Sequence, residues 1–118
     1  MRHHDKNKKL GRVKRVRVAL LRSLARSLVL QERITTTTAK AKALRPFVER
    51  LISTSKRNTV QSRRSVLATL GDTQDAVKKL HDTIAPRYAS RAGGYTRITR
   101  LGRVGKRMIE SARIELVN

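Results

Sequence analysis

The sequence predicts an α+β fold of two layers, in which helices pack on a small mixed sheet and a basic extension precedes the body. Apolar residues recur at helical spacing through much of the chain, β-branched or alternating segments follow, and Gly or Pro separates the segments. The length of 118 residues and the 38% of hydrophobic residues suit one domain with a modest core. We expect a basic arm over 1–15 and a single domain over 16–118.

The arm is predicted from its charge. The first seventeen residues carry eight Lys or Arg side chains but only one acid, Asp5. So few apolar residues cannot offset the entropy of ordering the segment. We therefore expect an arm that is mobile in the free protein and ordered on a phosphate surface, with a tail of no function as the alternative.

The first helix is predicted from about Val16 to Leu30. Its apolar positions repeat every three or four residues, at Leu20, Leu21, Leu24, Leu28 and Val29. Arg15, Arg22 and Arg26 fall within about 40° of one another on the opposite face, at about 100° per residue. Arg17 points toward the apolar side, which favours a helix start after it. The arginine row suits phosphate better than plain solvation.

Residues 33–38 are rich in Thr and Ile, which is typical of a short strand. The last threonines of this strand are suited to cap a second helix. The apolar stripe of that helix contains Leu44, Val48, Leu51, Ile52 and Ser55. Pro46 lies inside it and, lacking an N–H donor, should kink or restart the helix.

Two shorter helices follow. Asn58 or Thr59 caps the third helix, which ends at Gly71, with Val60, Val66, Leu67 and Leu70 facing inward. Asp72 or Thr73 caps the fourth helix, which stops before Pro86, with Val77, Leu80 and Ile84 facing inward. Both are expected to be packing elements.

The C-terminal third predicts a loop and two strands. Residues 87–94 form the loop, 95–101 the first strand, 102–105 a turn region and 108–117 the second strand. In the last strand the apolar side chains alternate with charged ones, with Ala112, Ile114 and Leu116 on one face. The expected order is helix, strand, three helices and two strands.

The net charge points to a polyanionic partner. There are 29 Lys or Arg residues against 8 acids, a formal charge of +21. Residues 1–58 carry +14, 59–86 only +1, and 87–118 carry +6. Nucleic acid is the natural partner, because Lys and Arg release counterions condensed on phosphates. The nearly neutral middle segment is expected to face solvent or protein.

The sequence gives no sign of catalysis or of a cofactor. It has no Cys, its acids are scattered, and His3, His4 and His81 are its only imidazoles, the last expected on a solvated helix face. His3 beside a free amino terminus could bind Cu(II) or Ni(II), but an accidental position is the better interpretation. With no apolar run of about 18 residues and no secretory pattern, a cytoplasmic protein is expected.

Residues 87–97 are the most informative stretch for nucleic-acid binding. A glycine pair, Gly93–Gly94, lies among three arginines and two tyrosines (Arg87, Arg91, Arg97, Tyr88 and Tyr95). Glycine lets backbone N–H groups approach phosphates closely. Each tyrosine can stack on an unpaired base or pack in the core. Because the chain has only three aromatic residues, base stacking cannot supply most of the affinity.

Several motifs resemble those of the bacterial large-subunit ribosomal protein seventeen family. They are Met1-Arg2-His3, Lys9-Leu10-Gly11-Arg12, Ile34-Thr35-Thr36-Thr37, Lys40-Ala41-Lys42-Ala43-Leu44-Arg45, Arg91-Ala92-Gly93-Gly94-Tyr95-Thr96-Arg97-Ile98 and Ile114-Glu115-Leu116-Val117. The resemblance implies an α/β body with a basic N-terminal extension. It also implies binding to large-subunit (23S) ribosomal RNA near the exit of the nascent-chain tunnel, beside neighbouring ribosomal proteins. The chain departs from the family pattern over 13–18 and 105–108.

The main hypothesis is a structural constituent of the large ribosomal subunit that binds RNA and acts in translation, without enzymatic activity, metal or cofactor. The predicted RNA-binding residues are Arg2, His3, Lys6, Lys8, Lys9, Arg12, Arg15, Arg22, Arg26, Lys40, Lys42, Arg87, Tyr88, Arg91, Gly93, Gly94, Tyr95 and Arg97. A basic nucleoid-type DNA-binding protein is the alternative, and a preference for linear duplex DNA over structured RNA would favour it. A cationic membrane-surface peptide fits less well, because no large apolar face is left without a partner.

Overall fold

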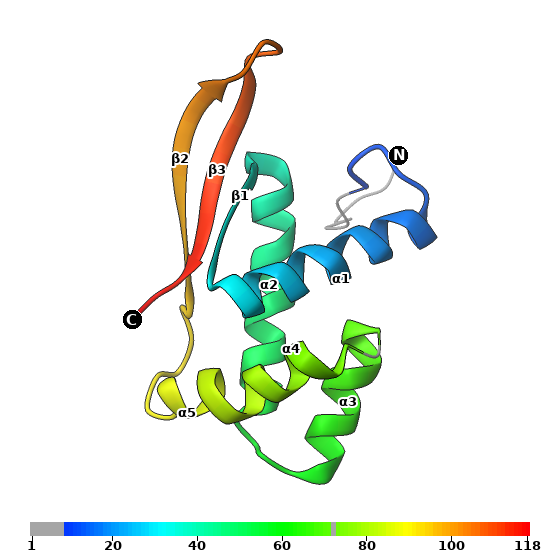
Figure 1. The fold of residues 1–118 in the computed structure, drawn as a ribbon, viewed down its shortest axis with the longest axis vertical. Helices are drawn as coiled ribbons and strands as arrows, with labels where there is room; N and C mark the ends of the chain where they lie inside the picture. Colours follow the sequence, from blue (N-terminus) through cyan, green and yellow to red (C-terminus); the bar gives the residue numbers. More distant parts are fainter. Residues whose placement is uncertain (1–8, 72) are drawn as a thin grey trace, which may run out of the picture.

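Two eighteen-residue helices, α1 (Lys14–Gln31) and α2 (Thr38–Ser55), cross beside a three-stranded sheet (Figure 1). This is the arrangement in the computed structural model, which describes residues 9–71 and 73–118. The molecule measures 44 × 33 × 26 Å along its principal axes. The α+β class is confirmed.

The predicted arm lies mostly outside the described residues, which begin at Lys9. The backbone N–H of Arg12 donates to the Lys9 carbonyl at 3.0 Å and closes a turn. Helix α1 then begins at Lys14, so Arg15 belongs to the helix and not to the arm. The expected helix start after Arg17 is also wrong. Arg17 lies within α1 and is only half-buried, so its aliphatic stem can pack on the apolar side while its guanidinium group stays in water.

Helix α1 ends in a left-handed cap. Glu32 has φ +65°, and its N–H donates to the Leu28 carbonyl at 2.7 Å, which is the usual way to satisfy a last-turn carbonyl. The chain then enters strand β1 (Arg33–Thr37). The Thr37 hydroxyl accepts the Lys40 N–H at 3.3 Å and caps α2, as the sequence predicts.

Helix α2 runs through Pro46 without restarting. The ring removes the hydrogen bond to the Lys42 carbonyl, but both residues are exposed, so water can bind that carbonyl. The inward stripe is buried as expected, with Leu44, Val48 and Ile52 fully inaccessible to solvent.

Helix α3 (Val60–Leu70) begins at a capping box in which Thr59 and Ser62 bond to each other's backbone N–H. It ends at Gly71, which has φ +77°. Ser62, Val66 and Leu70 face the core at a spacing of four residues. Val60 lies off this stripe and is 67% exposed, so the expectation that it faces inward is wrong.

The last helical region is continuous from Gln74 to Arg87, as α4 (Gln74–Lys79), a π-helical turn η1 (Leu80–Ile84) and α5 (Ala85–Arg87). The predicted stop before Pro86 is wrong, because the helical region continues through the π-helical turn and ends at Arg87, one residue after Pro86. His81 is 4% exposed and not solvated. It lies one helical turn after Val77, and its Nδ1 is 3.1 Å from the Val77 carbonyl.

Strands β2 (Thr96–Val104) and β3 (Ile109–Leu116) form a hairpin, and β3 lies between β1 and β2. The sheet is antiparallel and not mixed. Strands β1 and β2 do run in the same direction, but β3 separates them, so no parallel pair forms. Strand β2 extends past its predicted end at Leu101, where a bulge interrupts the register between Arg100 and Gly102.

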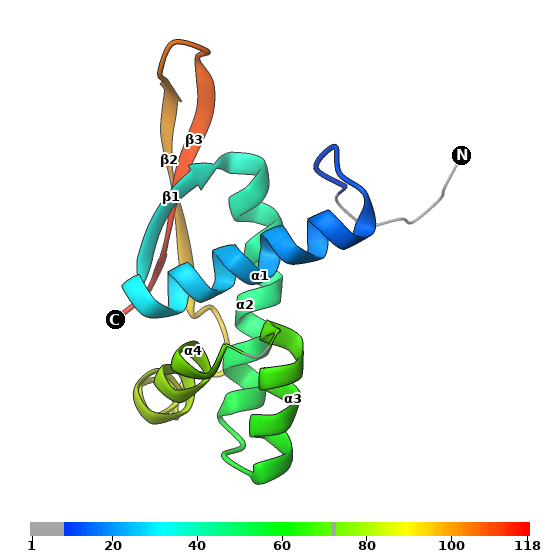
Figure 2. The same cartoon turned by 45° about the vertical axis from the view of Figure 1, so that its right-hand side comes forward.

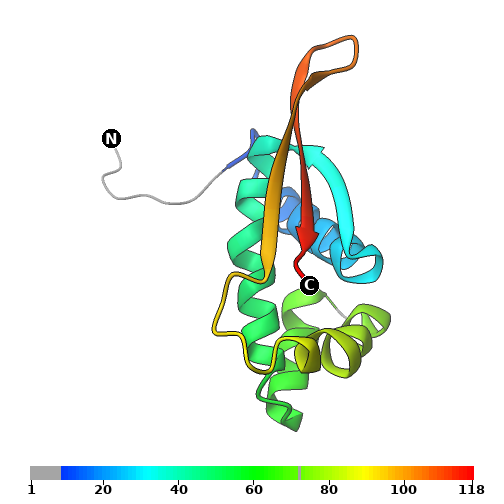
Figure 3. The same cartoon turned by 90° about the vertical axis from the view of Figure 1, so that its left-hand side faces the viewer.

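The core lies between α2 and one face of the sheet. Ala112, Ile114 and Leu116 of β3 are buried with the α2 stripe and with Leu28 and Val29 of α1. Figure 2 shows α1 passing across α2, with α3 and α4 side by side at one end. Figure 3 shows the hairpin projecting past the end of α2. Within 9–71 and 73–118, no helix is both long enough and apolar enough to cross a membrane.

Candidate nucleic-acid interface

Two tyrosines hold the ends of the glycine-pair loop, residues 89–94. Tyr88 and Tyr95 are each 2% exposed, and their ring centroids lie 5.1 Å apart at 44°. The Tyr88 hydroxyl donates to the Val117 carbonyl, and burial raises the pKa of Tyr88. Because both rings are buried, base stacking by these tyrosines, one of the two options weighed above, is not available in this structure.

The Tyr95 hydroxyl attaches the loop to the end of α2. It lies 3.4 Å from the Ser53 hydroxyl and 3.1 Å from Lys56 Nζ, and it donates to the Arg91 carbonyl at 3.3 Å. Lys56 also donates to that carbonyl and lies 5.3 Å from the Tyr95 ring centroid. The hydrogen bond with Ser53, followed by Lys56, lowers the pKa of Tyr95.

Between these anchors the loop presents its backbone and one arginine. Arg91 is exposed, and its Nε donates to the Gly93 carbonyl at 3.2 Å. Gly94 has φ +63°, and no atom lies within 4 Å of the place where its Cβ would be. The glycine pair is therefore accessible to a ligand, on a segment whose two ends are fixed.

The predicted arginine row on α1 is only partly open. Arg22 Nε donates to the Thr69 carbonyl at 2.9 Å, and Arg26 pairs with Asp75 at 2.6 Å. The hydrogen bond from Arg26 lowers the pKa of Asp75. Of the three arginines in this row, only Arg15 is exposed and has no partner among the described residues. No acid lies between these arginines in the sequence, but α4 supplies Asp75, which is distant in sequence and pairs with Arg26.

Arg87 and Arg97 also have carboxylate partners. Arg87 donates to both oxygens of Glu32, at 3.1 and 2.8 Å, and this pairing raises the pKa of Arg87. Arg97 bonds to Glu115 through Nε at 3.1 Å and Nη2 at 3.0 Å. Glu115 is directly opposite Arg97 on β3. Both guanidinium groups therefore have a structural role in the free protein.

The remaining predicted residues are scattered over the surface. Lys9 and Lys42 are exposed, Lys40 is half-buried, and Arg12 donates to the Leu10 carbonyl at 2.7 Å. Arg2, His3, Lys6 and Lys8 lie outside the described residues. In Figure 1 the short segment 9–13, the start of α2 and the glycine-pair loop lie in different parts of the molecule.

Most acidic side chains of the described residues form ion pairs within the molecule. Of the six carboxylates of these residues, all but Glu110 form an ion pair with Lys or Arg, namely Glu32, Glu49, Asp75, Asp82 and Glu115. Since cations exceed acids by 21, the excess must be balanced by external anions.

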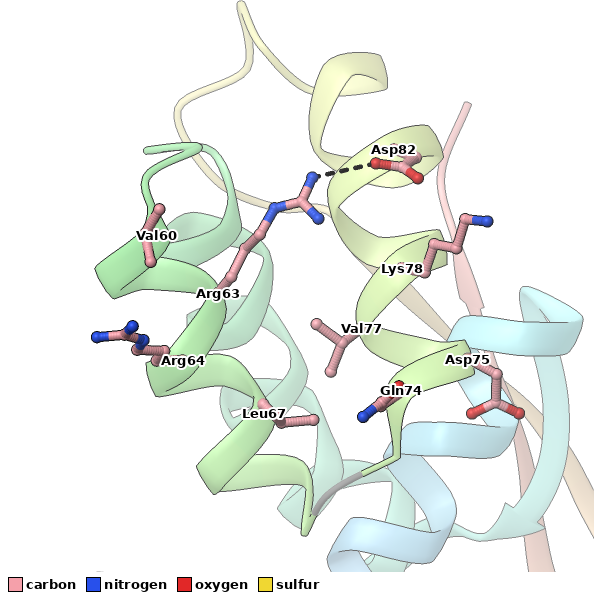
Figure 4. A pocket seen from close by; sticks show the side chains of 9 residues that line it. All are labelled: Val60, Arg63, Arg64, Leu67, Gln74, Asp75, Val77, Lys78 and Asp82. Carbon is pink, nitrogen blue, oxygen red and sulfur yellow. Dashed lines mark hydrogen bonds and ion pairs between the residues drawn. The ribbon is translucent and has the colours of Figure 1, made fainter.

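The middle segment differs from this cationic surface. A hollow of about 480 Å³ lies between α3 and α4, and Figure 4 shows cations and acids together around it. Arg63 crosses it to hydrogen-bond Asp82 at 3.2 Å, and Val60, Leu67 and Val77 add apolar surface. Mixed charge of this kind does not favour phosphate. Within 9–71 and 73–118 no group of three His, Cys, Asp or Glu side chains could hold a metal ion.

The predicted RNA-binding residues leave out the cations of the β2–β3 hairpin, although residues 105–108 depart from the family pattern with added charge at Lys106 and Arg107. Arg100, Arg103, Lys106 and Arg107 are all exposed, and none forms an ion pair or side-chain hydrogen bond with another described residue. The signal was present as four cations within the eight residues 100–107.

Comparison with known proteins agrees with the motifs. Residues 20–117 match the family described as Ribosomal protein L17. The large ribosomal subunit protein bL17 of Akkermansia muciniphila is 53% identical over 117 residues, which cover 99% of this chain and 83% of that protein. The bL17 of Hydrogenobaculum sp. is 54% identical over 101 residues, with 86% and 85% covered. The chain therefore belongs to the ribosomal protein L17 family, and its function is that of a structural, non-enzymatic constituent of the large ribosomal subunit in translation.

Proposed function

We propose that this chain binds large-subunit (23S) ribosomal RNA through its N-terminal arm, the exposed cations of α1 and α2, and the glycine-pair loop. The surplus of positive charge carries the proposal, since the described acids are nearly all paired within the molecule. Lys and Arg neutralise phosphates where RNA segments approach, and the folded body fixes their relative positions. The location near the tunnel exit, beside other ribosomal proteins, rests on the family resemblance.

The contacts of each side chain support a division of roles among the predicted residues. Lys9, Arg15, Lys42 and Arg91 are the exposed candidates for direct phosphate contact. Arg22, Arg26, Arg87 and Arg97 first position the elements that carry them, through bonds to other parts of the chain. Tyr88 and Tyr95 act through the loop they hold.

Salt dependence of binding tests this electrostatic account. If about eight phosphates are contacted, the logarithm of the binding constant of the full chain for its RNA falls with log salt at a slope of about −6 to −7. A slope shallower than about −2 contradicts the proposal. Linear duplex DNA of equal length is the competitor, and preferential binding to it would instead favour a nucleoid-type protein.

A further inference from the structure

The tip of the β2–β3 hairpin extends beyond the rest of the sheet. Strand β1 pairs with β3 only from Ser111 to Glu115. Past that point the ribbon has two strands, with Arg103 opposite Glu110 and Val104 opposite Ile109. All ten residues from 101 to 110 are exposed, and Figures 1 and 3 show them projecting away from the helices.

Four large apolar residues of this tip are exposed to solvent. Leu101, Val104, Met108 and Ile109 are 42%, 49%, 59% and 44% exposed. Val104 and Ile109 are opposite each other and therefore share one face of the ribbon. Neighbouring exposed apolar residues mark an interaction surface more often than isolated ones do. A two-stranded ribbon is also only marginally stable in water, so a binding partner would stabilise it.

The charge of the tip identifies the partner's chemistry. The tip carries four cations, Arg100, Arg103, Lys106 and Arg107, and a single acid, Glu110. Within the described chain these four cations have no carboxylate partner, whereas Arg26, Arg87 and Arg97 of the body each have one. A surface that combines free cations with apolar side chains complements a sugar–phosphate backbone better than it complements an average protein surface.

We infer that the hairpin tip, residues 100–110, is a separate RNA-binding element that lies across a double-helical segment of ribosomal RNA. The inference extends the proposed function to a surface outside the arm, the helix faces and the glycine-pair loop. The minor groove of an RNA helix is wide and shallow and displays riboses, so it admits a narrow ribbon. Val104, Met108 and Ile109 pack against the sugars, and Lys106 and Arg107 of the adjoining turn contact the phosphates on the edges of this groove. Arg103, opposite Glu110, lies on the other face of the ribbon from Val104 and Ile109.

A charge-matched pair of variants of the full chain tests the inference. K106A/R107A removes one Lys and one Arg from the tip, and R64A/K78A removes the same two residue types from exposed positions beside the hollow of α3 and α4. In binding titrations to the large-subunit RNA, the slope of log K against log salt should become shallower by about 1.5 for K106A/R107A and stay near the wild-type value for R64A/K78A. Equal slopes for the two variants would overturn the inference.

A neutral substitution and a crosslink complete the experiment. M108S should weaken RNA binding without altering the salt slope, because its contact is not electrostatic. A photoreactive residue at 108 in assembled subunits should crosslink to RNA, and exclusive crosslinking to protein would contradict the inference. If the wild-type slope of log K against log salt is steep but the tip variants bind as wild type does, only the inference about the hairpin is contradicted. If the wild-type slope is itself shallow, the proposed function is contradicted.

Discussion

Arg87 and Glu32 form a two-bond ion pair that joins the end of α5 to the C-terminal cap of α1. The distances are 3.1 Å for Nη1–Oε2 and 2.8 Å for Nη2–Oε1. Lys79 Nζ approaches the same carboxylate at 3.5 Å, and the Glu32 carbonyl accepts the Leu116 N–H at 3.0 Å. One residue thus connects the first helix, the last helical turn and the final strand.

Removal of the Glu32 carboxylate charge should destabilise the fold. We expect E32Q to lower the free energy of unfolding by about 1 kcal/mol, because the pair is about one-third exposed and partly screened. Urea denaturation of the free protein measures the change. D82N is the control, since the Arg63–Asp82 pair is about half exposed on both sides and its loss should have a smaller effect. A larger effect for D82N would contradict this assignment.

The same pair predicts a pH dependence of stability. The hydrogen bond from Arg87 holds the pKa of Glu32 below its ordinary value of 4.5, despite partial burial, which raises it. Its contribution is therefore complete above about pH 4.5 and is lost as the pH falls through the lower folded-state pKa. Denaturation midpoints measured from pH 6 to pH 3 should converge for wild type and E32Q at the acid end. A constant difference across that window would refute the linkage.

The Tyr95 hydroxyl should control the order of the glycine-pair loop. Y95F keeps the buried ring but removes the bonds with Ser53, Lys56 and the Arg91 carbonyl, at a cost of about 1 kcal/mol. Hydrogen exchange of residues 89–94 should become faster. Y88F is the matched control, because its lost bond is to Val117 and should affect the C-terminus instead. Equal exchange in both variants would show that the ring, and not the hydroxyl, holds the loop.

Two glycines with left-handed backbones should differ in their tolerance of alanine. Gly71 has φ +77°, and a Cβ there would lie 3.2 Å from Arg22 Cδ, whereas Gly94 has φ +63° and open space. Both substitutions strain the backbone by about 1 kcal/mol or more, but G71A must also displace Arg22. Thermal unfolding should therefore show the larger loss for G71A. The reverse order would mean that the loop backbone is more constrained than its surroundings indicate.

Substitutions of Arg91 and Arg87 should affect different properties, RNA binding and folding stability respectively. R91A removes an exposed cation and should make the salt slope of RNA binding shallower by about 0.7–0.9 with little change in unfolding. R87A leaves Glu32 without its main partner and should lower stability first. Parallel titration and denaturation of both variants check this. A stability loss in R91A equal to that in R87A would assign Arg91 a structural role as well.

The helices were largely predictable because their signals are local. The Thr37 cap, the Thr59 capping box and Gly71 each act within four residues, and the apolar stripe of α2 reads directly as its buried face. The errors occur where tertiary contacts determine the end of a helix or the face that is buried. The helical region that starts with α4 continues through a π-helical turn past Pro86 to Arg87, and Val60 lies outside the buried stripe of α3.

The candidate site also has a part that the sequence predicted and a part that depends on tertiary contacts. The sequence identified the Arg91–Gly94 loop, but it could not show that Tyr88 and Tyr95 pack against each other beneath it. The hairpin cations were left out of the predicted RNA-binding residues, because nothing local reveals that residues 101–110 extend beyond strand β1 of the sheet.

The sequence alone determined the positive charge, which is a sum over residues, and the α+β class, which follows from short local patterns. The resemblance of its motifs to the ribosomal protein L17 family indicated a non-enzymatic protein of the ribosome. Only the tertiary structure decided which cations remain available to an outside anion. Arg26 meets Asp75 and Arg87 meets Glu32 across 49 and 55 residues of chain. A guanidinium is neutralised by whatever carboxylate folding brings within a few ångströms, and charge counting along a sequence carries no such distances.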